Sequence, residues 1–251
     1  MFEPNEREVL RRIRPEDRVL DVGGWARPFN RADVVVDAEP YETRGYYRRE
    51  GGAGAQGGSV ERFTRETWIQ MDVCGPRPLP FPDRHFDFAV CSHTLEDVRD
   101  PLFLCAELIR VAKAGYIEVP SRAAESSRGC EHPAIAGYSH HRWLIDIDGS
   151  VVTFMMKYHL IQADWRYSLP QEFLWALSDS RRVQWLFWED RFEFRERVIH
   201  GAAQQIAELE RFVRVTHPYP AWQLAASDAA RAALALPRRA ARRLFRAAGG
   251  R

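Results

Sequence analysis

Two apolar runs that lie close together near the start of the chain constrain its fold most. VLDV at 19–22 is followed at once by two glycines, and DVVVD begins at residue 33. An apolar run that ends in glycines is typical of a buried strand that leads into a ligand-binding loop. Only eight residues separate the second glycine from the second run, whereas parallel strands joined through a helix need roughly 10–12 residues. The spacing predicts that the first crossover helix is reduced to a turn or lost.

The loop after the first run lacks the glycines that a dinucleotide requires. Such a loop uses three glycines in G-x-G-x-x-G, because its backbone must approach a pyrophosphate closely. Here only Gly23 and Gly24 are present, and Trp25, Arg27 and Pro28 follow them. This pattern argues against NAD or FAD and favours a cofactor without phosphates.

Further apolar runs predict an α/β protein with a mostly parallel sheet. Such runs lie at 68–73, 86–92 and 116–120, and they alternate with loops and helix signals. A short helix is expected at 5–14. Six glycines between Gly45 and Gly58 predict a mobile loop.

One helix is marked clearly by its ends. Asp100 can cap it, Pro101 suits its first position, and Gly115 is expected just past its last turn. Its apolar stripe comprises Leu104, Leu108 and Val111.

After residue 140 the pattern changes. The segment 143–161 predicts two strands around an Asp-Gly-Ser turn, and 202–215 predicts a helix. No clean linker precedes this part. We therefore expect 141–228 to be an elaboration of the same domain on the acceptor side, followed by an Arg-rich tail at 229–251.

Several segments between about residues 18 and 121, taken in their order along the chain, resemble the motifs of the class I S-adenosylmethionine-dependent methyltransferases. VLDVGG resembles the first motif of that family and VVVDAEP the second, whose acid holds the ribose. The stretch from MDVCGP to EDVRDP (71–101) resembles the third and fourth motifs, and GYIEVPS the next strand and loop. The chain departs from the family in its first loop, which has G-G-W-A-R in place of G-x-G-x-G.

The resemblance implies a Rossmann-like fold, with helices on both faces of the sheet and a C-terminal antiparallel and helical elaboration. It also implies a cofactor, S-adenosyl-L-methionine, and assigns 1–140 to the domain that binds it. A phosphate-free nucleoside with a sulfonium group agrees with the loop described above.

The resemblance and the positions at strand ends together predict the cofactor site. Asp37 would grip the ribose diol, or simply cap a turn before Pro40; Asp72 would accept from the adenine amine, or act as a turn residue. Trp25 would form a wall at the methionine end or plug the pocket. The full predicted set is Asp21, Gly23, Gly24, Trp25, Arg27, Asp37, Asp72, Val73 and Ser92.

Histidines are the candidate general bases, because their ordinary pKa lies near neutrality. His93 follows the fourth strand, and His140 and His141 lie in a long polar loop after the fifth. We predict His140 or His141 as the base; the alternative is that one packs and the other bonds backbone. Together with Cys130 and His132 they give a spacing that matches no common zinc pattern, so no metal is predicted.

Two further features leave alternatives open. Asp97 could orient a histidine or bind a cationic acceptor, although capping the next helix is the simpler role. The aromatic segment 165–192 could form a lid over the acceptor, a homodimer face or core, with core as the default.

Composition limits the partners. The formal net charge is +1, so no general affinity for nucleic acid is expected. No acid follows Asp228, and the tail arginines carry +7, which leaves −6 for the rest of the chain. A basic amphipathic tail can bind anionic membranes, but a solvated terminus is the more common outcome and the one we expect. Scattered cysteines and an N-terminus without an apolar core indicate the cytoplasm.

These observations predict a methyltransferase that acts on a small molecule. O-methylation in specialised metabolism, or of a sugar-containing intermediate, is the expected reaction. The alternative is a non-catalytic relative that has lost its cofactor and binds a partner.

Overall fold

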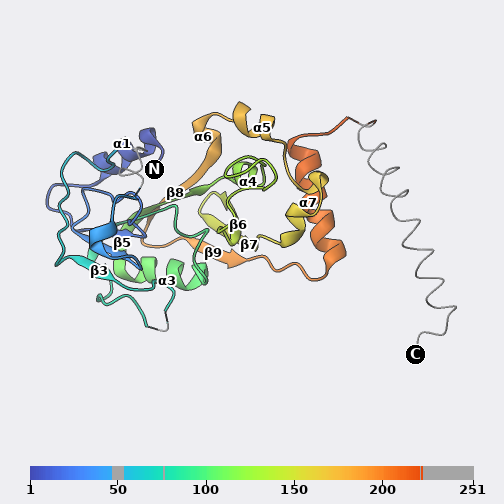
Figure 1. Ribbon diagram of the computed structural model, residues 1–251. Helices are drawn as coiled ribbons and strands as arrows, with labels where there is room; N and C mark the ends of the chain where they lie inside the picture. The colour runs from blue at the N-terminus through green and yellow to red at the C-terminus, as the bar shows by residue number, and fades with distance from the viewer. Residues whose placement is uncertain (47–53, 76, 221, 223–251) are drawn as a thin grey trace.

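A six-stranded sheet forms the centre of the protein. The computed structural model describes residues 1–46, 54–75, 77–220 and 222. The strand order is β3-β2-β1-β4-β5-β8, in which the first five strands run parallel and β8 is antiparallel to β5 (Figure 1). The strands are β1 (Val19–Val22), β2 (Val34–Asp37), β3 (Trp68–Gln70), β4 (Phe86–Ser92), β5 (Ala112–Pro120) and β8 (Val183–Glu189). This confirms the predicted α/β class.

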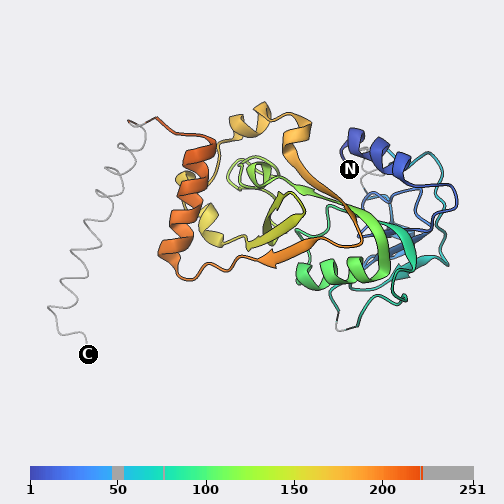
Figure 2. The ribbon, with the colours of Figure 1, turned by 180° about the vertical axis from the view of Figure 1, so that it is seen from behind.

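Helices cover both faces of this sheet, as predicted. The helix α1 (Glu3–Arg12) packs Val9 against one face, next to Val19 and Val35. On the other face, α3 (Pro101–Val111) contributes Leu104 and other apolar residues to a larger core. Figures 1 and 2 show these two helices on opposite sides of the strands. Alternate strand residues face the two cores because side chains in a strand alternate in direction.

The first crossover contains no helix, as its short length predicts. The chain between β1 and β2 turns through Phe29, whose side chain is fully buried against the α1 face. The N–H of Phe29 donates to Asp21 Oδ2 at 2.8 Å. A single large aromatic side chain and α1 together cover the face that a crossover helix would otherwise occupy.

Part of the Gly-rich segment packs, contrary to the prediction of a mobile loop. Residues 47–53 lie outside the described part of the chain. Gln56, however, is only 4% exposed and pairs with Phe29 in an isolated bridge. At Gly57 (φ +74°) a Cβ would meet the Phe29 ring at 2.5 Å. We predicted a loop from the conformational freedom of glycine. At Gly57 the absence of a side chain also allows the backbone to pack closely against Phe29.

The helix α3 begins as predicted but does not end at a glycine. Asp100 caps it, accepting from the N–H of Phe103 at 2.9 Å. The helix passes directly into β5, so the prediction that Gly115 follows its end is wrong. Gly115 lies within β5, where a Cβ would meet Ala89 O at 2.5 Å and the Trp188 ring at 2.7 Å.

The C-terminal half adds a second, three-stranded sheet of order β6-β7-β9. Its first two strands form the predicted hairpin around the turn at Gly149, and Ile145 and Phe154 join the core beneath α3. The same half supplies β8 to the central sheet, which fits an elaboration rather than an independent domain. Its elements are α4 (Arg122–Glu125), β6 (Trp143–Asp148), β7 (Val151–Met156), η2 (His159–Gln162), η3 (Trp165–Tyr167), α5 (Gln171–Ala176), α6 (Asp179–Arg182), β9 (Glu193–Glu196) and α7 (Ala202–Thr216); η1 (Tyr41–Thr43) follows β2.

The aromatic segment 165–192 divides between core and surface. Trp188 is buried in the core, whereas Trp175 is 64% exposed. Within the part of the chain that the structure describes, no helix has the length and apolarity needed to cross a membrane. The Arg-rich tail at 229–251 lies outside the described residues.

The cap of α3 gives a test of the fold. We expect Asp100→Ala to lower the free energy of unfolding by about 1 kcal/mol, because the N–H of Phe103 loses its acceptor. Asp100→Asn keeps a capping oxygen and serves as the control. Urea denaturation of the two variants measures the difference, and equal unfolding midpoints for both would contradict the assigned cap.

Candidate active site

A cavity of about 880 Å³ opens at the carboxyl ends of β1, β2 and β4. In a parallel sheet, loops at this edge form the usual ligand site. Six residues of the predicted cofactor set line it, and so do all three predicted catalytic histidines. They are Gly23, Trp25, Arg27, Asp37, Val73, Ser92, His93, His140 and His141. Asp21, Gly24 and Asp72 are not among the lining residues.

Both loop glycines are required by close packing. Gly23 has φ +79°, and a Cβ there would lie 2.1 Å from Thr94 Oγ1. At Gly24 a Cβ would lie 2.2 Å from Asp21 Oδ2. Gly23 therefore lets the backbone of the first loop lie against the turn after β4, and Gly24 lets it cover a buried carboxyl group.

Asp21 lies beneath the loop rather than in the cavity. Burial raises its pKa to about 7, although the bond from the N–H of Phe29 opposes this shift. From this position the carboxyl group orders the loop through its bond to Phe29. The same position gives the carboxyl group no direct path to a ligand in the cavity.

Asp37 faces the cavity and also holds the loop. Its Oδ2 accepts from the N–H of Trp25 and its Oδ1 from the N–H of Glu39, both at 2.9 Å. Burial raises its pKa, and these backbone bonds oppose the rise. Each carboxylate oxygen can accept a second hydrogen bond, so the turn role and a grip on a diol are compatible.

Trp25 forms part of the cavity wall and leaves the cavity open. Its indole Nε1 donates to Thr43 Oγ1 at 2.9 Å, and its ring stacks on Tyr46 at 5.3 Å between centroids. These contacts hold the ring against the segment after β2. Arg27 also lines the cavity, with its Nε donating to Gly54 O at 2.8 Å.

The structure places Asp72 in a turn, the second of the two roles that we considered for it: its Oδ1 accepts from the N–H of Cys74 at 2.8 Å. The side chain is exposed, and its Oδ2 lies 3.1 Å from an Arg99 nitrogen. Its neighbour Val73 is buried and lines the cavity. At the end of β4, Ser92 Oγ also lines the cavity and is buried without a hydrogen-bond partner. It is thus a polar group that a ligand in the cavity could satisfy.

His93 is held between two buried carboxylates. Its Nε2 lies 3.2 Å from Glu118 Oε1, and its Nδ1 lies 3.3 Å from Glu96 Oε1. Burial would lower its pKa, but the two carboxylates raise it to about 9. A histidine that is protonated at neutral pH does not suit the role of general base that we predicted for His93. It suits a fixed positive charge at the cavity.

Glu118 is a site residue that our sequence interpretation missed. It is fully buried in β5, and it also accepts from the N–H of Phe2 and from the hydroxyl of Tyr116. Burial would raise its pKa, but His93 and its other partners lower it to about 2. The available signal was an acid in the middle of the apolar run YIEVP, because a buried acid needs a partner.

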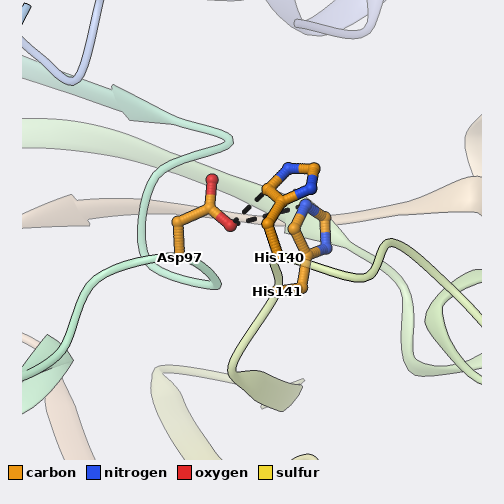
Figure 3. A group of neighbouring side chains, drawn as sticks. All are labelled: Asp97, His140 and His141. Carbon is orange, nitrogen blue, oxygen red and sulfur yellow. Dashed lines mark ion pairs between the residues drawn. The ribbon is translucent and has the colours of Figure 1, made fainter.

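Asp97, His140 and His141 form a cluster at the same cavity (Figure 3). Asp97 Oδ1 lies 3.9 Å from His140 Nε2 and 3.7 Å from His141 Nε2. The carboxylate comes from the turn after β4, and the histidines from the segment before β6. Asp97 does not cap α3. It faces the two predicted base candidates, which agrees with the hypothesis that it orients a histidine.

Glu125 stands behind this cluster and was also missed. It is buried in α4, and its Oε2 lies 2.8 Å from His141 Nδ1. Its Oε1 accepts from the Nζ of Lys157 and from the N–H of Tyr138. Burial lowers the pKa of His141, but Glu125 outweighs this effect and raises it.

Of the four residues that we considered together as metal ligands, only the histidine pair lies in the cluster. Cys130 Sγ instead contacts Ala124 O at 3.6 Å, and His132 Nδ1 accepts from the N–H of Ala134. The third member is Asp97, far away in the sequence. Sequence spacing could not reveal this grouping.

Charged groups of both signs line the cavity. Its acids are Asp37, Glu39, Glu96 and Asp97, and its basic residues include Arg27, His93 and Arg182. Its volume lies within the range of roughly 300–1,000 Å³ typical of small-molecule sites. The fold and this cavity therefore define a Rossmann-like protein whose ligand site lies at the carboxyl edge of the sheet.

A family model matches part of the chain. Residues 54–117 match the family model described as a methyltransferase domain. The match confirms the resemblance to methyltransferases and implies S-adenosylmethionine as the cofactor. It begins after the shortened first loop, which is the part that departs from the family. No match to a curated protein was found.

Several solved structures are similar over part of the chain. A putative methyltransferase from Bacillus halodurans is 17% identical, with 47% of this chain and 52% of that one covered and a TM-score of 0.32. S-adenosylmethionine-dependent methyltransferases from Aquifex aeolicus (18% identical, 47% and 65% covered, TM-score 0.32) and Mesorhizobium loti (20%, 62% and 65%, TM-score 0.33) give similar values. The chain thus spans between about half and two thirds of the length of these structures.

The raised pKa of His93 predicts a pH dependence of stability. The carboxylates of Glu96 and Glu118 favour the protonated ring in the folded state. The contribution of protonated His93 to the free energy of unfolding is therefore fully present below the ordinary histidine pKa of 6.5, and it is lost as the pH rises through about 9. We expect the thermal midpoint to fall less between about pH 7 and 9.5 in His93→Gln than in the unsubstituted protein.

The exposed residue His200 supplies the control. His200→Gln should keep the full pH dependence, as measured by thermal denaturation in matched buffers. If the midpoint of His93→Gln falls as steeply as that of the unsubstituted protein, His93 is not the group responsible.

Proposed function

We propose that this protein transfers a methyl group from S-adenosylmethionine to an oxygen of a small molecule. The observation that carries the proposal is the single cavity that unites two sets of residues. One set, around Asp37 and Ser92, suits the cofactor; the other, Asp97 with His140 and His141, suits the acceptor. The acceptor class that we propose is a specialised metabolite or a sugar-containing intermediate.

The cofactor side rests on charge and on unsatisfied polar groups. Asp37 keeps free acceptor capacity toward a ribose diol, and Ser92 Oγ has no partner within the protein. Gly23 lets the first loop approach the turn after β4 without obstruction. The indole of Trp25 borders the cavity without filling it.

The acceptor side rests on residues from two segments. Leu174 and Trp175 of α5 line the cavity together with Tyr138 and the histidine pair. A concave site of this volume favours a small acceptor, because small-molecule sites are typically clefts of roughly 300–1,000 Å³. No role for nucleic acid is part of the proposal.

The cofactor would supply a methyl group on a sulfonium sulfur, which retains the bonding electron pair and leaves as a thioether. The protein must align the acceptor oxygen with the methyl carbon, exclude water and accept the hydroxyl proton. We assign this proton to the Asp97–His140–His141 cluster, which keeps our prediction of His140 or His141 as the base. His93, already protonated, would contribute charge instead.

Calorimetric titration with S-adenosylhomocysteine tests the cofactor side. We expect Asp37→Asn to weaken binding by about 10-fold or more, because charge-assisted hydrogen bonds are worth about 1.5–3 kcal/mol. Asp72→Ala is the matched control, since this acid lies outside the cavity, and its affinity should stay within about twofold. Absence of heat at millimolar ligand would instead support a non-catalytic binding module.

Methyl transfer tests the acceptor side. The protein would be incubated with methyl-labelled S-adenosylmethionine and a mixture of hydroxylated small molecules that includes sugars. We expect His140→Gln/His141→Gln to lower product formation by about 100-fold or more, because general base catalysis typically contributes that much. Its affinity for S-adenosylhomocysteine should be unchanged. If product formation persists at the unsubstituted rate, the base assignment is wrong.

A further inference from the structure

We propose that Asp97, His140 and His141 bind a divalent transition-metal ion at the acceptor side of the cavity. Metal binding as such is independent of the proposed function. Only the role of the ion toward an acceptor rests on the proposed methyl transfer. Figure 3 shows both imidazole rings beside the same carboxylate.

The distances between the three side chains fit a shared metal ion better than direct hydrogen bonds between them. Asp97 Oδ1 lies 3.7 Å and 3.9 Å from the two imidazole Nε2 atoms, which is too long for a hydrogen bond. The three ligand atoms all lie within 4.8 Å of one another. Ligands at about 2.1 Å from a tetrahedral ion stand roughly 3.4 Å apart. Shifts of less than about 1 Å per side chain would therefore complete the site.

Asp97 Oδ1 is buried and accepts no hydrogen bond from the described residues. Its ion-pair contacts are with the same two imidazoles, at 3.9 Å and 3.7 Å. A buried carboxylate oxygen without a bond is costly. A bound cation placed between this oxygen and the two Nε2 atoms would remove that cost.

The other nitrogen of each imidazole faces a carboxylate. His141 Nδ1 lies 2.8 Å from Glu125 Oε2, and His140 Nδ1 lies 3.4 Å from Glu131 Oε1. Histidines that ligate metals usually donate their second N–H in this way, which fixes the ring and leaves the first nitrogen free to bind. Both Nε2 atoms lie within 4 Å of Asp97 Oδ1, and a carboxylate lies beside the second nitrogen of each ring.

Backbone hydrogen bonds hold the two ligand segments together. The carbonyl of Glu96, next to Asp97, accepts from the N–H of Arg142 at 2.7 Å and from the N–H of Trp143 at 3.3 Å. These donors follow His141 directly in the sequence. The ligands therefore come from two fixed, adjoining segments, and this arrangement favours a built site over a chance encounter.

The donor set indicates the class of metal. Two imidazoles and one carboxylate suit Zn²⁺, Mn²⁺, Fe²⁺ or Co²⁺, whereas Mg²⁺ and Ca²⁺ prefer oxygen ligands alone. Three protein ligands leave further positions open, as in catalytic rather than structural sites. Because all three residues line the cavity, an acceptor oxygen could occupy an open position. With the ion bound, the two histidines would act as ligands instead of as the base, and the hydroxyl proton would be released to water at a pKa that the ion lowers.

Cobalt titration tests the site directly. The chain without an affinity tag would be treated with a chelator, dialysed and titrated with Co²⁺ while visible absorption is recorded. We expect one equivalent of Co²⁺ to bind per chain. Asp97→Asn and His140→Gln should each weaken binding by about 100-fold or more, and Glu131→Gln by about 10-fold. His132→Gln, an exposed histidine in the same loop, should bind like the unsubstituted protein.

Two outcomes would overturn the proposal. One is that no absorption band develops; the other is that Asp97→Asn and His140→Gln bind Co²⁺ as tightly as the unsubstituted protein. Calorimetry with S-adenosylhomocysteine on the same samples separates this result from the proposed function. Cobalt binding without nucleoside binding would support the metal site and contradict the methyltransferase, and the reverse pattern would do the opposite.

Discussion

One hydrogen bond, from the backbone N–H of Phe29 to the buried carboxyl group of Asp21, allows the first crossover to form without a helix. Asp21 ends β1 beneath the first loop and receives the N–H of Phe29. This bond folds the short connection back over the sheet and seats the Phe29 ring where helical residues would otherwise cover the strands. Gly24 must lack a side chain for the loop to pass over Asp21. The position of Trp25 at the cavity follows from these constraints.

The cavity has two sides that are joined through β4. Ser92 ends that strand on one side, and Asp97 follows five residues later on the other. Between them lie His93 and Glu96, which pair with each other. A single turn therefore connects the two sides, and in the methyl transfer proposed above it would fix the position of cofactor and acceptor relative to each other.

Much of the fold could be predicted from the sequence because its signals are local. The apolar runs marked the strands, and Asp100 marked the start of α3, since a cap acts within one turn. Gly115 was misinterpreted because its neighbours, Ala89 and Trp188, are distant in sequence. The same reason explains the site. Glu118 is paired with Phe2 and with His93, which lies just after the neighbouring strand, and both are distant from it in the sequence. The acid beside the histidine pair likewise lies more than forty residues away from it.

The antiparallel strand β8 ties the C-terminal half of the chain to the central sheet. It pairs with β5 from Ala114 to Pro120, although the β6–β7 hairpin lies between the two strands in the sequence. Removing the C-terminal half would leave β5 as an open edge strand, which is a template for aggregation. This half is therefore not an interchangeable module, and a truncation before β8 would expose the centre of the molecule.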